Sequence, residues 1–147
     1  MYEELGDKRG ISIWMGNIAN ALKEQGENAR ALEYYFKALK LKEDLGDRKG
    51  ISIQLGNIGV VYDEIGDYTN AQKYYTSALK ISEELDDKNG AARSLCNLGA
   101  LYTTLKKYKE AEKYLLAASY RDIAFKPLMR AFPKAVSGKV VAMLGRP

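Results

Sequence analysis

The sequence has no histidine and only one cysteine, Cys96. Without histidine there is no Ser-His-Asp or Cys-His nucleophile system, and the commonest general base is missing. A single cysteine cannot form an intramolecular disulfide, and it cannot build a thiolate or histidine-bearing metal site. We therefore expect no enzyme, no metal and no cofactor. Cys96 is expected to be a small buried hydrophobe in a protein from a reducing compartment.

Long apolar runs are also absent. No stretch approaches the roughly 18 consecutive apolar residues that a membrane span needs, and the acidic first residues lack the apolar core of a signal peptide. We therefore expect a soluble, cytoplasmic protein without a membrane span. The 147 residues, of which 46% are hydrophobic, suffice for one ordinary domain with a core.

Most of the chain has no net positive charge, although the net charge of the whole chain is +4. Residues 1–118 hold 17 Lys and Arg against 18 Asp and Glu, whereas residues 119–147 hold six against one. A nucleic-acid-binding domain is usually basic over its binding surface. We therefore expect no nucleic-acid partner for the body of the chain.

The dominant positive signal is a repeat of 40 residues. Residues 5–44 align without gaps on 45–84 with 19 identities, and 45–84 align on 85–124 with 12. Each unit contains two stretches with apolar residues at three- and four-residue spacing, which is typical of amphipathic helices. One helical pair cannot bury its own apolar face, so neighbouring pairs must stack. The sequence thus predicts an all-α solenoid of three antiparallel helix pairs, followed by a basic C-terminal cap or tail over 125–147.

Turn and packing residues recur at the repeat step. Gly26 and Gly66 break the first two units, whereas Lys106-Lys107 replaces glycine in the third, so we expect that turn to be tighter or frayed. Small residues recur where the helices are expected to approach closely, and the large Tyr35, Tyr75 and Leu115 recur beside them, so we expect large residues of one helix to face small residues of another. The recurring small residues are Ala19, Gly59 and Gly99 in the first helices, and Ala31, Ala71, Ala111, Ala38, Ala78 and Ala118 in the second ones. Tyrosines of the second helices are predicted to pack in the core rather than to stack on nucleic-acid bases: Tyr34, Tyr35, Tyr74, Tyr75 and Tyr114.

The repeat resembles the tetratricopeptide consensus over about residues 5 to 124. The middle unit matches it at Leu55-Gly56-Asn57-Ile58-Gly59-Val60-Val61-Tyr62, Gly66-Asp67-Tyr68, Ala71, Tyr74-Tyr75 and Ala78-Leu79. The unit exceeds the family's usual 34 residues. Its long linker resembles that of G-protein-signalling-modulator adaptors, kinesin light chains and bacterial regulatory arrays. The resemblance implies a right-handed superhelix whose first helices line a concave groove. The chain departs from the consensus in its missing prolines, in the Lys106-Lys107 turn and after Ala118.

The resemblance directs attention to one arc of each first helix, away from its packing face. At about 100° per residue, the successive arcs hold Ile13, Asn17, Asn20 and Glu24; Ile53, Asn57, Val60 and Glu64; and Arg93, Asn97, Ala100 and Thr104. We predict a peptide-binding groove formed by Asn17, Asn20, Glu24, Asn57, Glu64, Arg93 and Asn97.

The recurring asparagines Asn17, Asn57 and Asn97 would form a ladder along this groove. The small Gly16, Gly56 and Cys96 beside them would leave room for a guest chain. Two alternatives remain open at this point. In the first, each asparagine bonds to the neighbouring repeat and fixes the angle between the two repeats. In the second, the asparagines recur only because the repeats were duplicated.

The sequence therefore predicts a non-enzymatic scaffold that binds a protein or peptide segment, with no small-molecule substrate. One alternative is a sensory or regulatory segment of a larger signalling protein. Another is a nucleic-acid or membrane-surface binder that works through the basic tail; we favour a cap for this tail.

The first residues point to a longer array. Residues 2–7 resemble residues 82–87, where a second helix ends, so we expect a further helix pair to precede this one. Trp14, whose counterpart in the next unit is Gln54, is then contact area for that pair. The alternative is an exposed hot spot at the start of the array.

Overall fold

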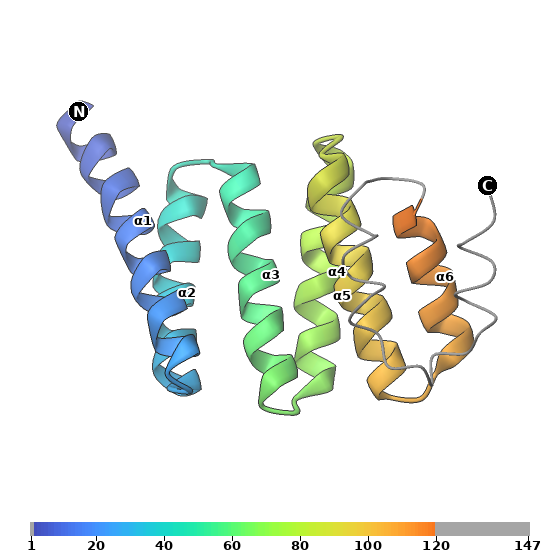
Figure 1. Cartoon of the computed structure of the whole chain (residues 1–147). Coiled ribbons are helices and arrows are strands. Elements are labelled where there is room, and N and C mark those ends of the chain that lie inside the picture. The colour runs from blue at the N-terminus through green and yellow to red at the C-terminus, as the bar shows by residue number, and fades with distance from the viewer. Residues whose placement is uncertain (1, 120–147) are drawn as a thin grey trace.

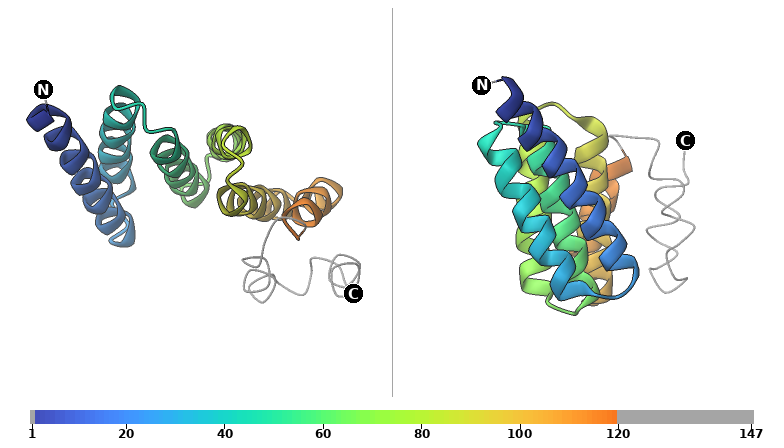
Figure 2. Two further views of the ribbon diagram at one scale, coloured as in Figure 1. Left: turned by 90° about the horizontal axis from the view of Figure 1, so that it is seen from above. Right: turned by 90° about the vertical axis from the view of Figure 1, so that its left-hand side faces the viewer.

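The computed structural model describes residues 2–119, without the side chains of residues 2–5. This part of the chain holds six helices and no strand: α1 (Tyr2–Glu24), α2 (Asn28–Asp44), α3 (Arg48–Glu64), α4 (Tyr68–Glu84), α5 (Lys88–Thr104) and α6 (Tyr108–Ser119). They pack as three antiparallel pairs in a row, α1 with α2, α3 with α4 and α5 with α6 (Figure 1). Seen from above, the first and second helices alternate between two layers (Figure 2). The predicted α-solenoid is confirmed.

The five turns between helices share one backbone geometry. Gly26, Gly46 and Gly66 take positive φ angles, of 78°, 66° and 82°. Asp86 (φ 54°) and Lys106 (φ 59°) hold the same place in the other two turns. The expectation of a tighter or frayed turn at Lys106-Lys107 is therefore wrong. The helices packed on either side fix the turn, and a lysine can adopt the left-handed region at a modest energetic cost.

Aspartates begin three of the helices. Asp47 and Asp87 accept hydrogen bonds from the backbone N–H of Gly50 (2.9 Å) and Gly90 (3.1 Å), and Asp67 caps α4 through the N–H of Asn70 at 3.2 Å. Such a cap satisfies a backbone donor that has no partner within the helix. The bond from Gly50 is also the main reason that the pKa of Asp47 is lowered.

Large side chains of the second helices pack against small residues of the first helices. A Cβ added to Gly59 would lie 2.6 Å from Cδ1 of Tyr75, and one added to Gly99 would lie 2.6 Å from Cδ2 of Leu115. The predicted pairing of small and large residues is thus confirmed in these two pairs. The second-helix tyrosines pack as predicted: Tyr35 and Tyr75 are buried, and Tyr34, Tyr74 and Tyr114 are half-buried.

Cys96 is buried and packs in a cluster with Leu95, Leu115 and Ala118. Burial raises the pKa of its thiol to about 11, so the thiol is protonated at neutral pH and unreactive. Cys96 is the small buried hydrophobe that the sequence predicts.

The start of the chain differs from the expectation. Residues 2–7 do not form the end of a second helix but continue α1, which begins six residues ahead of the positions equivalent to the starts of α3 and α5. The predicted cap or tail over 125–147 lies outside the described residues. None of the described helices is long and apolar enough to cross a membrane.

Asp63 provides a pH-dependent test of this packing. Its Oδ2 accepts a hydrogen bond from Tyr75 Oη at 3.2 Å, yet burial raises the pKa of Asp63 above its usual 3.8. A carboxyl whose pKa is higher in the folded state stabilises the fold at low pH, and this contribution is lost as pH rises through the folded pKa. We therefore expect Asp63→Asn to raise the melting temperature near neutral pH and to have a smaller effect near about pH 4. Thermal melts at both pH values check this, and a loss of stability at neutral pH would contradict it.

Candidate functional site

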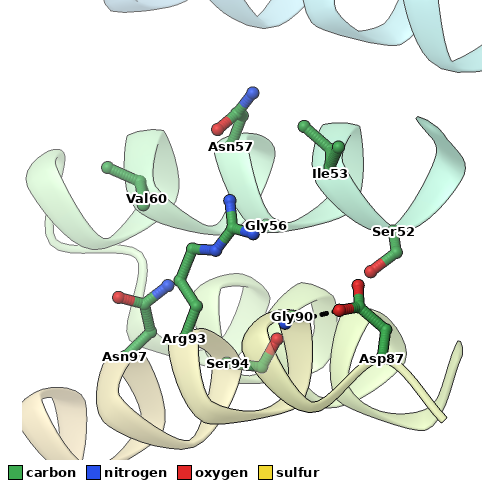
Figure 3. Close-up of a pocket in the computed structure, with 10 residues that line it drawn as sticks. All are labelled: Ser52, Ile53, Gly56, Asn57, Val60, Asp87, Gly90, Arg93, Ser94 and Asn97. Carbon is green, nitrogen blue, oxygen red and sulfur yellow. Dashed lines mark hydrogen bonds between the residues drawn. The ribbon is translucent and has the colours of Figure 1, made fainter. Parts of the chain in front are cut away.

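Two pockets open on the face formed by the first helices, which we call the first-helix face. The N-terminal pocket lies between α1 and α3 and has a volume of about 360 Å³. The C-terminal pocket lies between α3 and α5 and has a volume of about 160 Å³ (Figure 3). Nine of the ten residues that line the C-terminal pocket lie 40 positions after residues that line the N-terminal one. The two pockets are therefore one structural element, repeated at the step of the sequence.

The three asparagines predicted to form a ladder all line these pockets. Asn17 and Asn57 line the N-terminal pocket, and Asn57 and Asn97 line the C-terminal pocket. Asn17 is exposed and the other two are half-buried. Within residues 2–119, none of the three side chains forms a hydrogen bond, so the alternative in which each bonds to the neighbouring repeat has no support here. Their amide donors and acceptors are available to another molecule.

Asn20 lines the N-terminal pocket but has a structural partner. Its Oδ1 accepts a hydrogen bond from the hydroxyl of Tyr35, which ties α1 to α2. Burial, with the nearby charges of Glu64 and Glu24, raises the pKa of Tyr35 to about 12, so the hydroxyl stays protonated as a donor. Both glutamates are exposed and line neither pocket. The structure thus gathers these three predicted residues around Tyr35.

Arg93 is exposed and lines the C-terminal pocket. In Figure 3 its side chain extends from α5 toward Gly56 of α3. The guanidinium makes no ion pair with the described residues. Asp87 lies at the other end of the pocket, where it is engaged as the cap of α5. The smaller pocket therefore combines a positive charge without a partner and a negative charge that already accepts a hydrogen bond.

Gln54 is a pocket residue that the sequence analysis missed. Gln54 lines the N-terminal pocket and is only 8% exposed. Its Oε1 is buried without a hydrogen-bond partner among the described residues. Leaving such an atom unsatisfied costs about 1–3 kcal/mol. A Cβ added to Gly16 would lie 3.3 Å from its Nε2, so glycine gives this amide its room. The available signal was a glutamine within the apolar series Ile51, Leu55 and Ile58.

One predicted neighbour of the ladder lies elsewhere. Gly16 and Gly56 line the pockets, but Cys96 lines neither of them and packs in the core instead. Among the described residues, no further first helix follows α5 to form a pocket wall beside Cys96. The expectation that all three positions leave room for a guest chain is therefore wrong for Cys96.

Comparison with known proteins supports the repeat. Sequence profiles described as tetratricopeptide repeat match residues 51–119 and 15–49. No curated protein matches the chain in sequence.

Several solved structures share the fold. A signal transduction ATPase with numerous domains (STAND) from Pyrococcus horikoshii, which carries a tetratricopeptide repeat sensor, is 23% identical with a TM-score of 0.76, over 88% of this chain and 20% of that one. Apo RapI is 23% identical with a TM-score of 0.70, over 86% and 49%. BtubC from P. vanneervenii is 19% identical with a TM-score of 0.68, over 91% and 54%. The chain spans between a fifth and about half of these proteins.

Proposed function

Because the chain belongs to the tetratricopeptide repeat family, whose repeats generally serve as protein-interaction modules, we propose that it binds an extended segment of another protein along its first-helix face. The observation that carries the proposal is the row formed by Asn17, Asn57 and Asn97. These side chains have no hydrogen-bond partner within the described residues, and they recur once per repeat beside the pockets.

The spacing of the row suits a peptide backbone. Packed helices lie about 8–10 Å apart, and an extended chain advances about 3.3–3.6 Å per residue. Asn57 of α3 and Asn97 of α5, on two helices that contact each other, would therefore meet peptide groups about three residues apart. Each amide can accept from a backbone N–H and donate to a carbonyl. Such contacts give affinity with little dependence on the ligand's sequence.

The two pockets would supply the sequence preference. The N-terminal pocket is the larger, and the apolar Ile13 and Ile53 line it together with Gln54, whose amide oxygen has no hydrogen-bond partner among the described residues. The C-terminal pocket is smaller and presents Arg93. We infer that the larger pocket takes a bulky ligand side chain and that the smaller one takes a side chain with a hydrogen-bond acceptor.

The double variant Asn57→Ala, Asn97→Ala tests the proposal. Proteins captured from a lysate by the wild-type chain would be identified, and their binding segments remeasured as synthetic peptides. We expect wild-type dissociation constants on the order of micromolar and a loss of about tenfold or more in the double variant. The melting temperature should stay unchanged, because neither amide bonds to the described residues.

Asn89→Ala is the matched control, because Asn89 is an exposed asparagine of α5 that lines neither pocket. It should leave binding unchanged. If the double variant lost fold and binding together, the ladder would be structural. Unchanged binding in the double variant would place the ligand elsewhere.

A second candidate function is a sensory or regulatory segment of a larger signalling protein. The likeness in fold to the tetratricopeptide repeat sensor of the STAND protein favours it. This role requires an effector domain in the same polypeptide. Determination of the full reading frame around residues 1–147 checks this, and a frame without an effector domain would rule it out.

A further inference from the structure

An apolar stripe on α1 faces solvent in the structure. Ile11, Trp14 and Ile18 are 45%, 74% and 42% exposed. They lie three and four residues apart, so they share one face of the helix. We call these three residues the outer stripe. It is distinct from the arc of α1 that lines the N-terminal pocket.

The equivalent positions of the next two repeats are covered. In α3, Ile51 is half-buried, Gln54 is 8% exposed and Ile58 is fully buried, and in α5 the residues Ala91, Ser94 and Leu98 are all buried. The helix pair before each of them provides the cover, since α2 packs on α3 and α4 packs on α5. The outer stripe is therefore the third occurrence of an interface that is filled twice within the chain.

A second, independent feature lies just before the stripe. In the turn before α3, Gly46 takes a φ of 66° and Asp47 accepts from the N–H of Gly50. A Cβ on Gly50 would lie 2.5 Å from Asp47 Oδ2, so the carboxylate in this position leaves no room for a side chain at residue 50. The same Gly-Asp-x-x-Gly pattern stands 40 residues earlier, at residues 6–10.

In α1 these residues have no such purpose. A Cβ on Gly6 or on Gly10 would meet nothing within 4 Å, and the Asp7 side chain makes no hydrogen bond in the described part of the chain. Glycine inside a helix is less stable than alanine. The pattern fits a turn and a cap, and it disfavours the continuous helix in which it lies.

We propose that the outer stripe is the stacking interface for a preceding helix pair of the same repeat type. When that pair docks, residues 2–7 change from helix to turn, Gly6 takes a positive φ, and Asp7 caps a shortened α1 through the N–H of Gly10. The turn decides between a pair in the same polypeptide and a second copy of the chain. Turn residues serve only a chain that continues covalently into the docked helix, and a second copy would leave Gly6 and Asp7 without a role.

The test extends the chain with its own sequence. Residues 45–84 are fused ahead of Leu5, so that the new junction reproduces that of Glu84 with Leu85. Trp14 is the only tryptophan, and its emission is expected to shift to shorter wavelength in the fusion as the indole leaves water. The melting temperature should rise as well. Unshifted emission in a folded fusion would overturn the proposal.

The effect of Gly10→Ala on the melting temperature is expected to have opposite signs in the 147-residue chain and in the fusion. In the 147-residue chain it is expected to raise the melting temperature, because residue 10 lies within a helix. In the fusion it should lower the melting temperature, because Cβ would collide with the Asp7 cap. Gly50→Ala is the matched control and should lower it in both chains. A stabilising Gly10→Ala in both chains would contradict the change from helix to turn.

The rival occupant is a second copy of the chain. Sedimentation of the 147-residue protein should show no dimer that depends on the stripe. Trp14→Gln introduces the residue found at the equivalent position of the next repeat, Gln54. If the wild-type chain formed a dimer and this variant were a monomer, a second copy would cover the outer stripe, and the choice of occupant would be overturned.

Discussion

Replacing Tyr75 with alanine is expected to lower the free energy of unfolding by about 3–5 kcal/mol. Tyr75 is 2% exposed, and its ring lies against the bare backbone of Gly59. Because Gly59 has no side chain to move into the space, the cavity would stay largely open. A small domain has only about 5–15 kcal/mol of stability in total. Urea unfolding followed by circular dichroism measures the loss.

Tyr75→Phe separates the ring from the hydroxyl. It keeps the packing on Gly59 and removes only the hydrogen bond to Asp63, so its cost should be about 0.5–1.5 kcal/mol. If alanine and phenylalanine destabilised the protein equally, the contact with Gly59 would not be the source of the stability.

Ile58→Ala is expected to cost about 2–5 kcal/mol, whereas Ile18→Ala should cost less than about 1 kcal/mol. The two isoleucines occupy the same repeat position, but Ile58 is fully buried and Ile18 is 42% exposed. The side chain and the helix position are alike, so the difference measures what a preceding helix pair contributes. Parallel urea titrations of the two variants give this difference directly. Equal costs would show that Ile18 is covered in solution.

The fold could be predicted because one pattern repeats three times. The 40-residue step and the apolar spacing within it determine the number of helices and their pairing. The turn at Lys106 could not be foreseen, because glycine preference is a local rule while packing on both sides fixes this backbone. The continuous start of α1 escaped prediction for a related reason. Residues 6–10 carry the Gly-Asp-x-x-Gly pattern that forms a turn and a cap at residues 46–50, yet they lie within α1.

The candidate site was partly predictable. Helical spacing places Asn17, Asn57 and Asn97 on one face without knowledge of their neighbours. The bond from Tyr35 to Asn20 depends on how a second helix brings its hydroxyl within reach, and no spacing rule contains that distance. The burial of Gln54 likewise depends on the bare Gly16 of another helix. Residues whose role depends on contacts between helices were those that sequence reasoning missed.

The pattern of helix contacts has a mechanical consequence. The substantial contacts of the described helices join neighbours along the chain, and the one such pair that skips a helix is α3 with α5. Small rotations at successive helix interfaces therefore add along the array, so the array as a whole can bend and twist. A ligand bound in both pockets would contact α1, α3 and α5, and it would restrict rotation between the first and second repeats and between the second and third. Binding should thus stiffen the array along its length, and force spectroscopy on the loaded and the empty protein would report the difference.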